Sequence, residues 1–170
     1  MSDFDPHIVD SLGNVRLAGN FNYIKCIDPA SFEDKEDPLD QGNHVIDPSK
    51  AFEIQVQWTI SGSDAHARLL ALSPGNWFVR AFAESIGPGT DKDLGQVLVS
   101  VSPTTFTYNA ILVVPAGTLV ESNPGDSNNS GLYKIACSCF LDGPTPPSGF
   151  PGLDIIGFVE GPLIRMENRD

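Results

Sequence analysis

Positive charge is scarce in this sequence. Ten Lys and Arg residues stand against 22 Asp and Glu residues, which gives the 170-residue chain a formal net charge of −12. A chain of that charge repels nucleic-acid phosphates and anionic lipid headgroups, so we expect neither nucleic acid nor a membrane as a partner. The carboxylates favour solubility, and the partners that they would attract are a basic protein or divalent cations.

Long apolar runs are also missing. The longest, AILVVPAG at residues 110–117, is far shorter than the ~20 residues of a membrane helix. The opening residues, MSDFDPHIVD, have neither the basic nor the apolar stretch of a signal peptide. Three cysteines, an odd number, fit reduced thiols better than a disulfide framework. We therefore expect a cytoplasmic protein.

The known catalytic signatures are absent as well. The sequence contains no G-x-S-x-G, no phosphate-binding Walker loop, no H-E-x-x-H and no G-x-G-x-x-G. The histidines have no nucleophile or acid motif beside them: His7, His44 and His66. We expect no enzymatic activity and no cofactor.

Two glutamates in apolar surroundings keep one enzymatic alternative open. Glu84 lies in AFAESIG and Glu160 in GFVEGPL. If both were buried and faced each other, with raised pKa values, they would resemble the carboxylate pair of a glycosidase. The alternative is that each bonds a backbone N–H group or an arginine such as Arg80 or Arg165.

Alternating apolar and polar residues dominate what is present. In residues 51–62, AFEIQVQWTISG, the apolar side chains from Phe52 to Ile60 fall on one face and the polar ones between them on the other. This alternation predicts a half-buried antiparallel strand. Seven segments are predicted as strands: 21–27, 51–62, 76–86, 95–103, 105–115, 132–141 and 155–168. Only residues 66–75 suggest a helical turn. This pattern, with 16 Gly and 14 Pro, predicts an all-β fold, a single antiparallel β-sandwich domain spanning residues 1–170.

Two segments lie outside that strand pattern. Residues 1–20 mix scattered apolar residues with turn formers and are expected to lie along the surface. Residues 28–44 form a long acidic loop, expected to be solvated and mobile, although its carboxylates could also bind cations or a basic partner. The carboxylates concerned are Glu33, Asp34, Glu36, Asp37 and Asp40.

The segment SGLYKI, residues 130–135, places a glycine directly before an alternating strand. In immunoglobulin-like sandwiches, a Tyr near the start of the sixth strand hydrogen-bonds to the chain upstream and closes the corner between the fifth and sixth strands. Gly131 and Tyr133 resemble that corner, and Trp77 resembles the buried Trp of the third strand. The resemblance implies an immunoglobulin-like β-sandwich of about seven strands in which Trp58 packs beside Trp77. No cysteine stands on the second strand, so an antibody-type disulfide is not expected.

Cys137 and Cys139 lie two residues apart on the sixth strand, so their side chains share a face. Their spacing differs from the Cys-x₂₋₄-Cys pairs of zinc sites, and only Cys26 remains to join them. A buried thiol behaves as a small apolar group. We therefore predict that both cysteines pack in the core; a bridge from Cys26 to either is the alternative.

A possible calcium loop precedes the same strand. Asp126, Asn128 and Ser130 occupy positions 1, 3 and 5 of a D-x-N-x-S-G pattern typical of calcium loops. The bidentate Glu at position 12 is missing, and these residues are also ordinary turn formers. The pattern leaves a weak calcium site as an alternative to a plain turn.

Strands 76–86 and 155–166 carry apolar residues on both faces, and a second apolar face needs cover from loops or from another subunit. We expect a non-enzymatic structural or interaction module, a subunit or accessory of an oligomer or larger assembly that binds a protein partner or itself. One alternative is a loop-based module that binds carbohydrate or calcium, and another is a hydrolase built on the two glutamates. The loops concerned are 87–94, 116–131 and 142–154.

Overall fold

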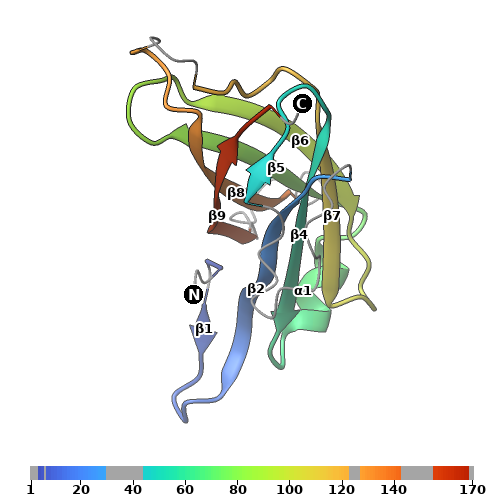
Figure 1. Cartoon of the computed structure of the whole chain (residues 1–170). Helices are drawn as coiled ribbons and strands as arrows, with labels where there is room; N and C mark the ends of the chain where they lie inside the picture. Colours follow the sequence, from blue (N-terminus) through green and yellow to red (C-terminus); the bar gives the residue numbers. More distant parts are fainter. Residues whose placement is uncertain (1–3, 6, 30–43, 123–126, 143–154, 169–170) are drawn as a thin grey trace.

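Two β-sheets face each other in the computed structural model, which describes residues 4–5, 7–29, 44–122, 127–142 and 155–168 (Figure 1). One helix and nine strands occur in these residues. In chain order they are β1 (Ile8–Val9), β2 (Val15–Ile27), β3 (Val45–Ile46), β4 (Phe52–Ser61), α1 (Ala65–Ala71), β5 (Asn76–Ser85), β6 (Lys92–Ser100), β7 (Thr107–Val114), β8 (Leu132–Asp142) and β9 (Ile155–Met166).

The first sheet has the strand order β1-β2-β4-β7, and the second has the order β3-β9-β8-β5-β6. All pairs are antiparallel except β3 with β9. The two sheets also approach each other along both sides. The edge strands β6 and β7 lie side by side, and β2 lies beside β9, next to the short edge strands β1 and β3. The sandwich is therefore nearly closed along both sides.

The structure confirms the all-β prediction, and each of the seven predicted strands corresponds to an observed one. The predicted number of seven strands omits β1 and β3, because each has only two residues and is too short to show an alternating pattern. The five-stranded sheet also curls into a half-barrel (Figure 1). Register shifts between Ala81 and Phe82, and between Lys134 and Ala136, are bulges of the kind that bend strands and increase their twist.

The N-terminal segment corrects a second expectation, because parts of residues 1–20 enter the core. Leu17, on a strand that begins six residues earlier than predicted, is buried, and so is Phe4. The Phe4 ring stacks on Phe21 with centroids 4.6 Å apart. It fits between the sheets because it lies over Gly19 and Gly157, where a Cβ atom would come within 2.6 Å of the ring.

Aromatic side chains fill the centre of the core. Trp58 and Trp77 are fully buried and pack edge to face, with centroids 5.4 Å apart, as the sequence predicts. Tyr108 stacks on Trp58 at 5.6 Å, and its hydroxyl donates to the Ser102 carbonyl at 3.0 Å. These rings join the two sheets, since Trp58 and Tyr108 lie in the first and Trp77 in the second.

The cysteines confirm the predicted core position. Cys26, Cys137 and Cys139 are buried and have free thiols. Burial raises the pKa of all three thiols, that of Cys137 to about 12. Such thiols are poor nucleophiles and metal ligands near neutral pH, because the thiolate is the reactive form.

The described residues contain no helix with the length and apolar character needed to cross a membrane.

Candidate functional site

The outer face of the five-stranded sheet carries exposed apolar side chains. Strand pairing aligns Leu98, Phe78, Phe140 and Ile156 in one row across β6, β5, β8 and β9. Phe158 stands in the next row, opposite Ser138. We call these five apolar residues the apolar row. Because strand side chains alternate, the opposite faces of the same strands supply the core.

The exposure of the apolar row is large. Leu98, Ile156 and Phe158 have 52%, 47% and 50% of their surface exposed. The half-buried rings of Phe78 and Phe140 lie with centroids 6.4 Å apart, within the range of interacting aromatic pairs. This arrangement confirms that β5 and β9 are apolar on both faces, as their sequences predict.

Charged groups border the apolar row. Arg80 pairs with Asp93, and its guanidinium lies 5.0 Å from the centroid of the Phe82 ring. The hydrogen bonds from Arg80 hold the pKa of Asp93 below its usual range. A hollow of about 330 Å³ lies beside this pair and reaches Phe158. The border therefore combines charges of both signs with aromatic surface.

The two glutamates of the carboxylate-pair alternative are both exposed, so the burial that this alternative requires is not found. Glu84, on β5, pairs with Lys134 of β8, and Glu160, on β9, pairs with Ala136 of β8. The strand β8 therefore separates the two glutamates. The apolar residues around them in sequence point alternately inward and outward, so an apolar neighbourhood along a strand does not bury every residue. The arginines suggested as their partners pair elsewhere: Arg80 with Asp93, and Arg165 with Glu167.

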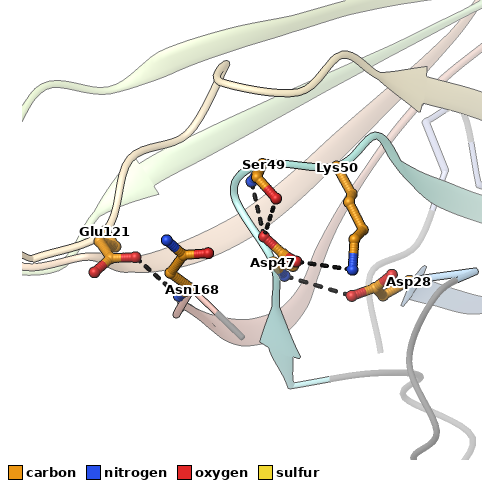
Figure 2. Close-up of polar contacts among 6 residues, drawn as sticks. All are labelled: Asp28, Asp47, Ser49, Lys50, Glu121 and Asn168. Carbon is orange, nitrogen blue, oxygen red and sulfur yellow. Dashed lines mark hydrogen bonds and ion pairs between the residues drawn. The ribbon is translucent and has the colours of Figure 1, made fainter. Parts of the chain in front are cut away.

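A different pair of carboxylates is buried. Asp28, directly after β2, and Asp47, directly after β3, are only 1% and 2% exposed (Figure 2). Asp47 accepts hydrogen bonds from the Ser49 amide at 2.9 Å and hydroxyl at 2.7 Å, and it pairs with Lys50 at 3.0 Å. Asp28 accepts the amide hydrogen of Asp47 at 3.4 Å. The expected solvated loop 28–44 therefore begins with a buried residue.

The chemistry of Asp47 is structural. The bonds from Ser49 and Lys50 lower its pKa to about 2, whereas a catalytic acid at neutral pH needs a raised pKa. Its contacts link the end of β2, in one sheet, to β3, in the other. In turn sequences such as Asp47-Pro48-Ser49, the Asp side chain typically hydrogen-bonds to the backbone two residues on. This pattern is the sequence signal from which the structural role of Asp47 could have been predicted.

Tyr133 makes the upstream hydrogen bond predicted for it. Its hydroxyl lies 3.4 Å from the Val120 carbonyl, 13 residues earlier, and 3.3 Å from Asn129 Oδ1. Gly131 has a φ of 65°, and a Cβ there would lie 2.5 Å from the Ser122 nitrogen. Asn129, which the sequence analysis did not single out, also donates to the Glu121 carbonyl at 2.9 Å.

The calcium candidates stay a prediction. Asp126 lies outside the described residues, and so do the acidic residues 33–40. The Ser130 hydroxyl lies 3.2 Å from the Leu132 amide nitrogen and 3.3 Å from its carbonyl oxygen, as in an ordinary turn. Among the described residues, no group of three or more His, Cys, Asp or Glu side chains is placed to hold a metal ion.

The chain was compared with protein-family models, with curated proteins and with solved structures, and none of the three comparisons found a match.

Proposed function

We propose that this chain is an immunoglobulin-like interaction module without enzymatic activity, which docks a protein partner on the outer face of its five-stranded sheet. The partner carries an apolar patch surrounded by basic residues. In the cell, the module would act as a subunit or accessory of a larger assembly.

The strand order supports the immunoglobulin-like part of the proposal. Of the seven long strands, the first, second and fifth share one sheet, and the third, sixth and seventh share the other. Immunoglobulin constant domains distribute these six strands in the same way but place the fourth in the first sheet. Here the fourth long strand, β6, pairs with β5 in the second sheet. An experimental structure with a different strand order would refute this assignment.

The apolar row is the observation that carries the docking proposal. Its three most exposed members, Leu98, Ile156 and Phe158, each expose about half of their surface. Contiguous apolar surface of this kind, bordered by polar groups, is typical of protein interaction sites. Aromatic residues together with arginine are enriched at such interfaces, and Arg80 lies beside Phe82 at the border of this one.

Charge favours a different protein over a second copy. Two copies of this chain would bring together formal charges of −12 each, and like charges oppose association. A basic partner gains from the same field, which also accelerates its approach. The free, buried thiols of all three cysteines support a reducing compartment such as the cytoplasm.

Site-specific photo-crosslinking tests the docking face. A photoreactive phenylalanine analogue at position 158 should form an adduct with a basic protein in extract from the source organism. The same analogue at position 113 is the matched control, because Val113 is 61% exposed on the outer face of the other sheet. Ile156→Asp should abolish the adduct at position 158, and added salt should weaken it.

Three outcomes would count against the proposal. Equal crosslinking at positions 158 and 113 would mean that the adducts are nonspecific. An acidic partner would contradict the charge argument. A dimer of the purified protein in light scattering, dissociated by Ile156→Asp, would assign the apolar row to a second copy instead.

A further inference from the structure

A groove of about 510 Å³ lies where β2 of one sheet meets β9 of the other. Its volume falls within the range of small-molecule sites. The side chains that line it include Asn22, Tyr23, His44, Lys134, Glu160 and Pro162. We call it the seam groove. It shares no residue with the apolar row or with the loops in which the sequence suggested ligand binding, although Glu160 lies two residues from Phe158 on β9.

Irregular backbone on both sides creates the seam groove. On β2 the pairing register shifts between Phe21 and Tyr23, which leaves Asn22 as the extra residue of a bulge. On β8 and β9 the register shifts between Lys134 and Ala136, next to Gly161-Pro162. Bulges redirect side chains and are frequent beside binding sites. Here two of them, far apart in sequence, face the same groove.

The polar groups of the groove are partly held in place. Asn22 donates to Gln57 Oε1 at 2.8 Å and to Thr59 Oγ1 at 2.9 Å, so its carbonyl oxygen is the group that it can offer a ligand. His44 Nδ1 lies 3.1 Å from the Leu163 carbonyl oxygen. If Nδ1 carries the proton, Nε2 is an acceptor in the neutral ring. The groove thus offers fixed hydrogen-bonding groups.

The mixture of charges limits the class of ligand. A bound anion would meet the Glu160 carboxylate, and a bound cation would meet the Lys134 ammonium, since both side chains line the groove. A neutral ligand with many hydroxyl groups satisfies both, because each hydroxyl donates one hydrogen bond and accepts others. The Tyr23 ring is partly exposed, with the Lys25 ammonium over one face at 4.7 Å from its centroid. The rest of the ring suits the C–H surface of a sugar ring.

An added peptide strand fits this edge less well. Strand addition requires a regular row of backbone donors and acceptors. Pro162 lacks the donor, and bulges twist an edge away from further pairing. The groove therefore favours recognition by side chains.

The outer face of the four-stranded sheet extends the groove. Asn22 is hydrogen-bonded to Gln57, and the Gln57 amide donates to Asn109 Oδ1 at 2.8 Å. The hydroxyls of Thr59 and Thr107 lie 3.0 Å apart. These bonds hold a line of polar groups across β2, β4 and β7. A ligand longer than one sugar unit can continue from the groove along this line. We propose that the seam groove and the adjoining polar line bind a neutral oligosaccharide.

Titration followed by amide NMR tests this assignment on the full chain. The probes are cellohexaose, xylohexaose, mannohexaose and chitohexaose as neutral ligands, and hexagalacturonate and chitosan hexamer as charged controls. At least one neutral probe should shift the signals of Asn22 and Tyr23 with millimolar affinity or better, while those of Leu98 and Phe78 remain unchanged.

Four substitutions make the test specific. Tyr23→Ala and Lys134→Ala should each weaken binding by about tenfold, the cost of one lost stacking contact or charged hydrogen bond. Val113→Ala, on the same outer face at its far edge, should leave affinity unchanged. Thermal melts verify that each variant is folded. Glu160→Gln keeps the hydrogen-bonding shape and, with a neutral ligand, should change affinity less than Lys134→Ala.

The proposal fails if no neutral probe shifts these signals at about 10 mM, a concentration that detects even millimolar affinity. It also fails if only the charged hexamers bind, or if the shifts cluster on the apolar row. Loss of oligosaccharide binding would leave the docking proposal intact, because no residue of the apolar row lines the groove. Failure of crosslinking at position 158 would likewise leave the seam groove untouched.

Discussion

The buried N-terminal phenylalanine permits a demanding test of the packing. Phe4 is 2% exposed, stacks on Phe21 and meets Trp77 edge to face at 6.0 Å. Truncation of a buried Phe to Ala typically costs 3–5 kcal/mol, and we expect about 3 kcal/mol for Phe4→Ala because a segment near the chain end can detach locally. If the N-terminal segment lay on the surface, the cost would be close to zero.

A second substitution probes the same contact from the opposite side. A Cβ atom on Gly157 would lie 2.6 Å from the Phe4 ring, so Gly157→Ala should cost about 2 kcal/mol, in the range for overpacked cores. In the double variant, the new methyl group occupies space that the ring has left. We therefore expect the pair to cost about 3 kcal/mol together, roughly 2 kcal/mol less than the sum of the single changes.

Urea denaturation, followed by the fluorescence of the buried Trp58 and Trp77, measures these free energies of unfolding. Leu12→Ala is the control, because Leu12 is 86% exposed in the same N-terminal region and should change stability by less than about 0.5 kcal/mol. Additive costs in the double variant would refute the proposed contact between Phe4 and Gly157. A cost for Phe4→Ala no larger than that for Leu12→Ala would refute its burial altogether.

Three further predictions concern other parts of the fold. Asp47 has a pKa of about 2 in the folded chain and about 3.9 when unfolded, so its stabilising effect is complete above about pH 4 and is lost as the pH falls towards 2. Asp47→Asn should therefore flatten the curve of unfolding free energy against pH in this range, measured by urea titrations. An unchanged slope would contradict the assignment. Cys137 and Cys139 are fully buried with raised pKa values, so thiol reagents at pH 8 should label them only as fast as the chain opens, and rapid labelling of the folded protein would place them at the surface. Tyr133→Phe removes a hydroxyl that lies 3.4 Å from the Val120 carbonyl. It should lower the free energy of unfolding by about 1 kcal/mol in the same denaturation assay. No loss of stability would mean that the hydroxyl is not bonded there.

The long strands could be predicted because each carries its own signal. In β4 the apolar side chains alternate with polar ones from Phe52 to Ile60, and the structure buries the first set. The same logic located the buried face of β8, including Cys137 and Cys139. Alternation is a local property of the chain, so one sequence suffices to find it.

Features that depend on distant parts of the chain could not be predicted in this way. Phe4 is one aromatic residue among turn formers, and its burial depends on two glycines, Gly19 and Gly157, in different sheets. Asp28 belongs by composition to an acidic stretch, and only its proximity to Asp47 distinguishes it. Contacts between the two sheets decide both cases, and no short window of sequence contains them.

The seam groove illustrates the same limit for function. Asn22 and Glu160 belong to strands that are far apart in sequence, and each alone is an ordinary exposed polar residue. Their meeting follows from the approach of β2 to β9, together with a bulge near each of them. A sequence pattern could predict that Pro162 interrupts its strand. It could not predict that Asn22 lies across the groove from that strand.

The contrast between the two outer sheet faces is the strongest argument for separate roles. On β4 the outward side chains are polar, and hydrogen bonds connect Gln57 and Thr59 to both neighbouring strands. On β9 the outward positions include Ile156 and Phe158, each about half exposed. The first face also carries two exposed apolar side chains at its β7 edge, Ile111 and Val113. On the second face, the apolar row crosses four strands. Contact with an apolar partner surface accounts for the difference, and the crosslinking comparison of positions 158 and 113 measures it directly.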